Sequence, residues 1–207
     1  ALELAAVRSI AGKVLELHNW KLPPFRSPHH TASSIALVGG GSPPRPGEIS
    51  LAHQGVLFLD ELPEFNRQVL ESLREPLESG TITISRAARQ AEFPAKFQLI
   101  AAMNPCPCGY FGSVTKHCEC SSERIRRYHK RLSGPFLDRI DMQVEVALSS
   151  KNSFLEKTET ENSKTIRSRV QKARDKQLYC RGTLNNSLSG KTLENVCKIS
   201  NKDQKLL

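Results

Sequence analysis

A short apolar run that ends in two acids constrains the fold of this chain more than any other feature. Residues 55–60 read Gly-Val-Leu-Phe-Leu-Asp, and Glu61 follows directly. Apolar residues without alternation are typical of a strand buried on both faces, as in a parallel α/β sheet. Ligands of such sheets bind beyond the carboxyl ends of the strands. We therefore expect Asp60 and Glu61 at a ligand-binding edge, although such a pair can also simply begin a turn.

A second apolar run, residues 97–103, ends in the polar Asn104. An Asp at the edge of a sheet can hold Mg²⁺. A neighbouring Glu can polarise the water that attacks a phosphate, and a side-chain amide can orient that water. Asn is also a common turn residue at the end of a strand. Together, Asp60, Glu61 and Asn104 favour a site of phosphate hydrolysis.

Helices and a hairpin are predicted around these strands. Helical spacing of apolar or basic residues predicts four helical segments and one helical turn, at 1–19, 66–78, 122–132, 163–178 and, for the turn, 134–141. Alternation predicts a hairpin of strands 81–85 and 92–96 around the basic turn 86–90, and a further strand at 142–147. Pro and Gly predict irregular loops at 22–30 and 39–47. The fold class is therefore α/β.

The chain of 207 residues is long enough for one domain and part of another. We expect a first domain over residues 1–150, a polar linker over 151–162 and a helical segment over 163–207. No run approaches the roughly 20 apolar residues that span a bilayer, and the start has no signal-peptide pattern. These features predict a cytoplasmic protein without a membrane partner.

The net charge of +9, from 30 basic and 21 acidic residues, has two interpretations. It fits a solvated basic surface, and it equally fits contact with nucleic acid or another polyanion. His29 and His30 lie in the Pro-rich loop without nearby ligand partners in the sequence, so we expect them to be structural.

Four of the six cysteines form two C-x-C pairs that lie nine residues apart within the loop 105–122: Cys106, Cys108, Cys118 and Cys120. Four thiolates on two short turns suit tetrahedral Zn²⁺, and nothing in the sequence indicates the secretion that disulfides usually accompany. The loop is therefore predicted to hold a structural zinc ion. His117 could substitute for one of the cysteines, but we expect it to be a bystander. The alternative is four reduced cysteines in a surface loop.

At this point the chain resembles a known family. Gly55-Val-Leu-Phe-Leu-Asp-Glu-Leu-Pro-Glu-Phe65 is similar to the Walker B strand of AAA+ ATPases, and more specifically of the magnesium-chelatase-like ComM/YifB proteins of bacteria. The resemblance covers residues 1–150 strongly and the remainder weakly. Other strings that carry it are Phe25-Arg-Ser-Pro-His-His-Thr-Ala-Ser33, Arg45-Pro-Gly-Glu-Ile-Ser-Leu-Ala-His53, Ala102-Met-Asn-Pro-Cys-Pro-Cys-Gly109 and Ser133-Gly-Pro-Phe-Leu-Asp-Arg-Ile-Asp141.

The resemblance implies a role for each site residue in a partial P-loop NTPase core. Asp60 would hold Mg²⁺, Glu61 would be the catalytic base and Asn104 would be sensor 1. Arg139 would be the arginine finger that reaches the ATP of a neighbouring subunit, a role for which a guanidinium is well suited. Arg131 is the rival finger. The structural alternative for Arg139 is an ion pair with one of its two sequence neighbours, Asp138 or Asp141.

One part of the family's pattern is missing, because the sequence contains no G-x-x-x-x-G-K-[ST] phosphate loop. We expect that loop upstream of Ala1 and the sensor 2 arginine beyond Leu207, which makes residues 163–207 a truncated helical lid. The chain alone is therefore predicted neither to bind ATP tightly nor to hydrolyse it.

For the full-length protein the resemblance implies a ring, expected to be a hexamer, that hydrolyses ATP to move or branch-migrate DNA during natural transformation. Its basic hairpin, with Arg86, Arg89 and Lys96, would face the pore and follow the DNA backbone. Residues 124–131 form a second basic cluster, which also fits a solvated helix face or a subunit contact. Two alternatives remain: a chelatase-type ATPase for metal insertion into tetrapyrroles, and a non-catalytic, zinc-stabilised module for DNA binding or assembly.

Overall fold

A computed structural model describes residues 1–13, 20–86, 89–113, 115–146 and 161–198. The chain divides into two compact units, Ala1–Ala147 and Leu148–Leu207, and each is described by itself. Among the described residues, no helix combines the length and the apolar content that a membrane crossing requires.

Three parallel strands form the central sheet of the first unit. β1 (Phe25–Arg26), β4 (Val56–Leu59) and β7 (Gln98–Ala101) lie in the order β1-β4-β7. On β4, Leu57 is paired with Arg26 on one side and with Leu99 on the other. The α/β class and the two predicted strands are confirmed. β1 is a strand that the sequence did not predict, because three prolines flank its two residues.

The pairing of β1 with β4 depends on glycine at position 55. A Cβ atom there would lie 2.0 Å from the carbonyl oxygen of Pro24. That oxygen accepts a hydrogen bond from the backbone N–H of Val56 at 2.8 Å. Only a residue without a side chain permits so close an approach of the two backbones.

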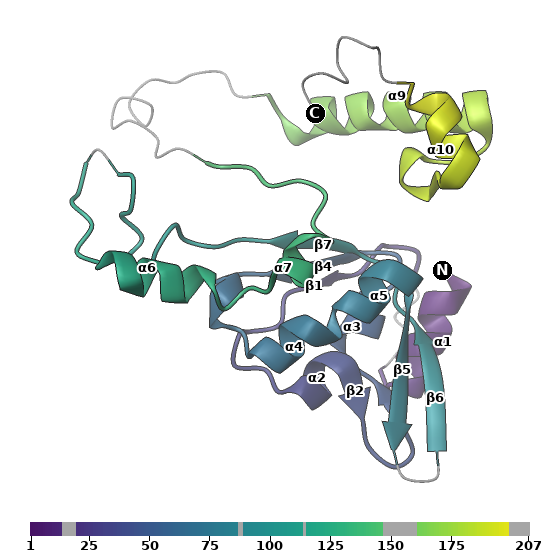
Figure 1. The fold of residues 1–207 in the computed structure, drawn as a ribbon. Coiled ribbons are helices and arrows are strands. Elements are labelled where there is room, and N and C mark those ends of the chain that lie inside the picture. The colour runs from purple at the N-terminus through teal and green to yellow at the C-terminus, as the bar shows by residue number, and fades with distance from the viewer. Residues whose placement is uncertain (14–19, 87–88, 114, 147–160, 199–207) are drawn as a thin grey trace. The chain divides into compact units, whose positions relative to one another are not determined.

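Short helices pack against one face of this sheet (Figure 1). They are α2 (Ser34–Val38), α3 (Glu48–Leu51), α4 (Arg67–Ser72), α5 (Arg74–Ser79) and α7 (Gly134–Leu137). The core that they share with the sheet has Leu57 and Leu59 from β4, and Ile49, Leu73 and Phe136 from the helical side, all fully buried. Burying each such side chain contributes roughly 1.5–3 kcal/mol.

The opposite face of the sheet is not covered by any described helix of this unit. Val56 and Phe58, which alternate with the buried leucines, are only half-buried. Phe25 stacks on Phe58 with 6.1 Å between ring centroids, yet it is 64% exposed, and Ile100 on β7 is 46% exposed. Burial of β4 on both faces was therefore a wrong prediction for the described residues, since its apolar run supplies one core face and one open face.

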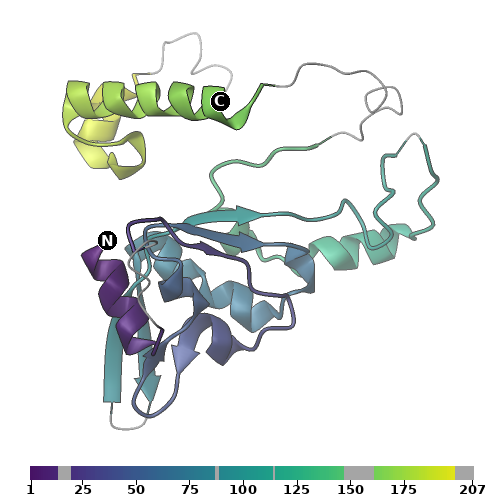
Figure 2. The same cartoon turned by 180° about the vertical axis from the view of Figure 1, so that it is seen from behind.

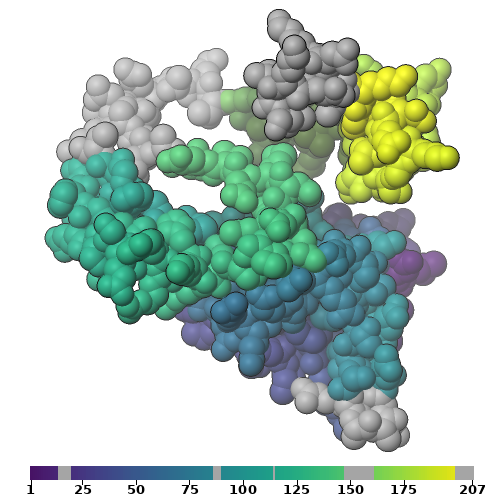
Figure 3. Space-filling model, viewed as in Figure 1, coloured from purple at the N-terminus to yellow at the C-terminus, as the bar shows by residue number. Residues whose placement is uncertain are grey.

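The predicted hairpin is present and projects from the sheet region (Figures 1 and 3). β5 (Thr81–Arg86) pairs with β6 (Arg89–Pro94), and Arg86 opposite Arg89 is the last pair. Residues 87 and 88, within the predicted turn, lie outside the described residues. Lys96 lies two residues beyond β6, at the base of the hairpin, so the second strand is shifted toward the turn relative to the prediction.

The first helix is shorter than predicted. α1 covers Leu2–Ile10, and Gly12 follows it with a left-handed φ of 71°. The rest of the predicted helix falls partly on residues 14–19, which lie outside the described residues. α1 lies beside the hairpin (Figure 2). The buried His53 connects the two, because it accepts the Lys96 N–H at Nδ1 (3.1 Å) and contacts Glu3 Oε2 through Nε2 (3.1 Å).

The helix predicted over 66–78 is two helices, α4 and α5, that meet at Leu73. Pro76 explains the break, because it has no N–H to donate to the carbonyl of Ser72 and its ring crowds that turn. Asn66 caps α4, accepting the Gln68 N–H at 2.9 Å. The bend turns α5 toward the start of β5.

The two Pro- and Gly-rich loops contain more structure than predicted, and one predicted strand is absent. β1 lies in the first loop, and a small hairpin of β2 (Gly39–Gly40) with β3 (Arg45–Pro46) lies in the second; α2 and α3 flank the second loop, where no element was predicted. In contrast, residues 142–146 form no strand, because no described strand pairs with them; Met142, Val144 and Val146 are all at least 75% exposed. Alternation alone does not make a strand where no partner provides hydrogen bonds.

The basic helix and the helical turn are confirmed as α6 (Ser122–His129) and α7. In the second unit, α9 (Ser163–Arg181) confirms the predicted helix and extends it to the αL glycine Gly182. A 3-10 turn (Asn185–Ser187) and α10 (Gly190–Val196) follow, and none of these elements has a buried residue. Most of the predicted linker lies within residues 147–160, outside the described residues, and the domain limits stay predictions.

Candidate functional site

The two acids and Asn104 follow the carboxyl ends of neighbouring strands. Leu59 is paired with Ala101, and the pairing continues past both strands: Ala102 donates to the Leu59 carbonyl at 2.9 Å and Leu62 donates to the Ala102 carbonyl at 3.0 Å. This backbone ladder holds the segment that carries the acids against the one that leads to Asn104. All three side chains are exposed, so they can meet a ligand at this edge.

A tight turn sets the direction of Glu61. Its backbone is left-handed (φ 52°, ψ 46°), and its N–H donates to Asp60 Oδ1 at 2.9 Å. A left-handed conformation costs a residue with a side chain roughly 1–2 kcal/mol. The turn begins η1 (Leu62–Glu64) and brings the Glu61 carboxylate to His30, whose Nδ1 lies 3.0 Å from Glu61 Oε2.

His30 is the part of the site that the sequence did not predict. It was expected to be structural because no ligand partner stands near it in the sequence. The contact arises because β1 pairs with β4. This pairing brings His30, which follows β1, to the edge of the sheet where Glu61 follows β4. His29 lies against it, with 4.1 Å between ring centroids, and Phe65 meets it edge-on at 6.4 Å. The missed signal was a short strand ending four residues before His30.

Both candidate finger arginines are held by acids within the unit. Arg139 donates to the Glu78 carboxylate and to the Pro135 carbonyl, so its intramolecular ion pair involves Glu78 and not Asp138 or Asp141. Arg131 donates to Glu64 Oε2 at 2.6 Å and to the Pro63 carbonyl at 3.0 Å. Arg131 thereby braces η1, the turn that follows the acids. The role of a finger toward a neighbouring subunit stays a prediction for both.

The four clustered cysteines come together as a donor set with the geometry of a tetrahedral metal site. Their Sγ atoms all lie within 4.8 Å of one another. Cys106 Sγ lies 3.3 Å from Cys108 Sγ and 3.7 Å from Cys118 Sγ, and the latter two are 3.6 Å apart. A tetrahedron with Zn–S bonds of about 2.3 Å has S···S separations of roughly 3.8 Å. No disulfide links them, so the donor set fits zinc.

The thiols of this cluster differ in their ease of ionisation. A backbone N–H of Tyr110, more than any other contact, lowers the pKa of Cys108 to about 6. At Cys118 a backbone N–H of Cys120 favours the thiolate, but burial and the neighbouring Cys108 and Cys106 outweigh it and raise its pKa to about 12. The negative charge of one thiolate therefore disfavours ionisation of the neighbouring thiols. A bound cation would allow all four to ionise.

Helix α6 ties the cysteine loop to the segment that carries Asn104. His129 Nε2 lies 3.0 Å from the Pro105 carbonyl oxygen. The buried Tyr128 has a raised pKa, first because of burial and second because of the Glu64 charge, while a hydrogen bond from the Asn104 backbone acts in the opposite direction. Cys106, two residues after Asn104, is fully buried. The metal-ligand cluster and the predicted sensor therefore share one short, anchored segment.

The basic groups divide between two places. On α6, Arg124 and Arg126 are exposed, as is Lys130 directly after the helix, while Arg127 forms an ion pair with Glu123 at 2.8 Å. On the hairpin, the backbone places positions 86 and 89 opposite each other at the end of the described ladder.

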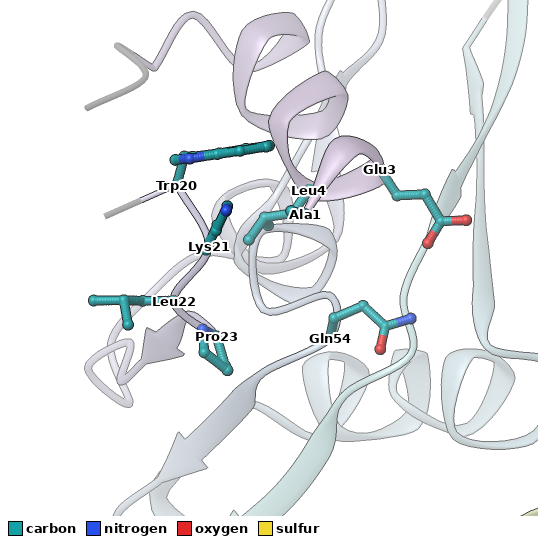
Figure 4. Close-up of a pocket in the computed structure, with 8 residues that line it drawn as sticks. All are labelled: Ala1, Glu3, Leu4, Trp20, Lys21, Leu22, Pro23 and Gln54. Carbon is teal, nitrogen blue, oxygen red and sulfur yellow. The ribbon is translucent and has the colours of Figure 1, made fainter. Parts of the chain in front are cut away.

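A pocket of about 300 Å³ lies elsewhere in the first unit (Figure 4). Its lining includes Glu3, Trp20, Lys21 and Gln54. Gln54 precedes β4, whereas Asp60 follows it, so the pocket lies at the amino ends of the strands. Ligands of α/β sheets bind at the other end, and the pocket does not contribute to the candidate site.

Comparisons with known proteins identify relatives of this chain. Residues 1–154 match the family model for magnesium chelatase, subunit ChlI. The chain is 52% identical over 98% of its length to competence protein ComM of Haemophilus influenzae, of which it covers 40%. It is 48% identical over 98% of its length to the uncharacterized protein YifB of Escherichia coli, again covering 40% of that protein.

Among solved structures, the chain is similar to NtrX from Brucella abortus in complex with ADP. The match covers 60% of this chain and 26% of the NtrX chain, with 16% identity and a TM-score of 0.40. The chain spans about 40% of the length of the curated relatives named above. The family match over most of the chain, together with the identity to ComM and YifB, shows that it belongs to the magnesium chelatase subunit ChlI family, among the ComM/YifB-like proteins.

Proposed function

We propose that the whole protein is a ring-forming AAA+ ATPase that hydrolyses Mg-ATP to move or branch-migrate DNA. One observation carries the ATPase part. Asp60 and Glu61 follow β4 and Asn104 follows the paired strand β7, so the three polar side chains stand at one edge of a parallel sheet. That edge is where α/β proteins bind nucleotides.

The three residues divide the work of hydrolysis. Asp60 would hold Mg²⁺, which supplies charge neutralisation for the phosphates when it is bound. Glu61 would accept the proton of the attacking water. Asn104 would orient that water or the γ-phosphate. The family's phosphate loop, which this sequence lacks, is expected in the remainder of the protein.

DNA is the proposed substrate of the motor because basic groups and the comparisons favour it. The chain carries a net charge of +9, α6 has exposed arginines, and Arg86 and Arg89 form the last described backbone pair of the β5–β6 ladder. A relative with 52% identity is named for competence. Arg86, Arg89 and Lys96 are proposed to contact the phosphate backbone, which basic side chains neutralise without reading sequence. The family's name favours the alternative, metal insertion into a tetrapyrrole.

We also propose that the four clustered cysteines hold a structural zinc ion. The support is the donor chemistry and the sulfur separations, which match a closed tetrahedral site without a vacant ligand position. Such an ion would fix the loop between β7 and α6.

ATP turnover by the whole protein, measured with and without a DNA four-way junction, tests the proposed motor. The proposal predicts turnover that DNA stimulates and junction branches that move only with ATP. Turnover that responds to a porphyrin and Mg²⁺, but not to DNA, would favour the tetrapyrrole alternative. DNA binding without any turnover would leave only a binding or assembly module.

A further inference from the structure

We propose that His30 is a positioning residue for Glu61. His30 Nδ1 lies 3.0 Å from Glu61 Oε2; the ring would donate its Nδ1 hydrogen to this oxygen and leave Oε1 for the attacking water. This inference rests on the proposed ATPase function, since it assigns His30 to the same site. Nothing in the sequence pattern of the loop indicates this role, which arises only because β1 lies beside β4.

The contact has the features of a polar contact that orients a side chain. Glu61 is 51% exposed at its side chain, so water reaches it, while the His30 side chain is only 28% exposed. The His30 ring is enclosed by His29 on one side and by the edge contact with Phe65 on the other. A flexible, exposed carboxylate is thus bound to a ring whose own orientation is constrained by packing. Constraining a reacting group in this way raises the fraction of time that it is aligned.

Adjacent histidines should carry their hydrogens on different nitrogens. His29 Nδ1 receives the backbone N–H of Thr31 at 3.3 Å and lies 2.9 Å from the Thr31 hydroxyl. As an acceptor, His29 Nδ1 has no hydrogen, which places the hydrogen on Nε2. His30 Nδ1 faces a carboxylate, which only accepts, so Nδ1 must carry the hydrogen. The pair therefore contains both tautomers side by side.

The proposed step balances with Glu61 alone as the base. The water oxygen forms a bond to the γ-phosphorus, the bond from that phosphorus to the leaving ADP oxygen breaks, and the water proton moves to Glu61 Oε1. His30 keeps its Nδ1 hydrogen throughout. Its contribution is the direction of the carboxylate, so its loss should lower kcat and leave the KM for ATP unchanged.

The first test needs no nucleotide. Nitrogen NMR of the histidine side chains in the 207-residue chain, at about pH 8 where ordinary imidazoles are neutral, reports which ring nitrogen carries hydrogen. We expect Nδ1–H for His30 and Nε2–H for His29, and Glu61→Ala should move only His30 away from the Nδ1–H form. An Nε2–H tautomer at His30 in the unsubstituted chain, or no response of His30 to Glu61→Ala, would overturn the proposal.

The second test is kinetic and uses the whole protein. His30→Ala should lower kcat for ATP hydrolysis on the order of tenfold, as loss of alignment does, with KM unchanged. His30→Asn should restore most of the rate, because the Asn Nδ2 donor occupies the position of His Nδ1. His29→Ala is the comparison variant: it removes one packing partner of the His30 ring but keeps the ring beside Glu61, so it should lower kcat less than His30→Ala does.

The outcomes separate this inference from the proposed function. A full rate in His30→Ala, or a lost rate that His30→Asn does not restore, would sink the positioning role while the ATPase stands. Absence of any ATP turnover by the unsubstituted whole protein, with the expected tautomers present, would refute the proposed ATPase and with it the catalytic part of this inference.

Discussion

At the scale of single residues, Gly55 tests whether the β1–β4 pairing holds the site together. In Gly55→Ala the new methyl would meet the Pro24 carbonyl oxygen, which lies 2.0 Å from the position of the added Cβ. We expect a loss of about 1–3 kcal/mol in the free energy of unfolding, as in other overpacked sites, measured by urea denaturation. Gly134→Ala, where no atom lies within 4 Å of the added Cβ, is the control; equal stability of the two variants would contradict the account.

Glu3 gives a pH dependence with a defined sign. Its hydrogen bond with His53, followed by the attraction of the His53 ring, holds the pKa of Glu3 below its ordinary value of 4.5. A carboxyl with a lowered folded-state pKa stabilises above the unfolded value, and that stabilisation is lost as the pH falls through the folded value. Thermal melting from pH 7 downward should therefore decline less below pH 4.5 in Glu3→Gln than in the unsubstituted chain. Parallel curves would show that the contact contributes nothing.

The sequence predicted those candidate site residues that belong to a local sequence pattern. Asp60 and Glu61 follow an unbroken apolar run, Asn104 follows another, and the cysteines stand in two close pairs. His30 could not be predicted in the same way, because its partner lies 31 positions away (61 − 30) and the strand that joins them has two residues. The partner of Arg139, Glu78 in place of an adjacent Asp, was missed for the same reason.

At the scale of elements, the cysteine loop connects the proposed zinc site to the predicted sensor. Removing the metal, by a chelator or by Cys118→Ser with Cys120→Ser, should release the loop and the segment at 104–106, because Cys106 is buried there and Pro105 is held by His129. Hydrogen exchange should then rise at residues 104–112 and stay unchanged on α3. Metal analysis of the natively purified chain should find about one zinc per chain; its absence would sink the zinc proposal.

Elements with a long, regular pattern were predicted correctly. Very short elements, and elements whose formation depends on a pairing strand or on a proline, were not. β4 and β7 each lie in an apolar run, and the hairpin, α6 and α9 each carry several residues of one periodicity. β1, α2 and α3 have only two to five residues each, too few for a period to show. The 142–146 segment alternates well but has no described strand beside it, and Pro76 divided a helix whose apolar stripe continues across the break. Hydrogen-bond partners, rather than side-chain pattern, decided these cases.

At the scale of the whole molecule, the arginine finger predicts complementation between subunits. Arg139→Ala and Glu61→Gln should each abolish ATP turnover of the whole protein. In mixed rings, the intact arginine of a Glu61→Gln subunit can face the intact Glu61 of an Arg139→Ala neighbour, so mixing should restore part of the rate. A mixture as inactive as its components would mean that Arg139 acts only within its own subunit, through its ion pair with Glu78.

The measurement that most directly tests the central claim is phosphate release from Mg-ATP by the whole protein with Glu61→Gln. The substitution removes the base but keeps the size of the side chain and its ability to accept a hydrogen bond from His30. We predict a fall in kcat of about 100-fold or more, with Mg-ATP binding retained. Hydrolysis at the unsubstituted rate would contradict the claim that the edge formed by Asp60, Glu61 and Asn104 is the catalytic centre.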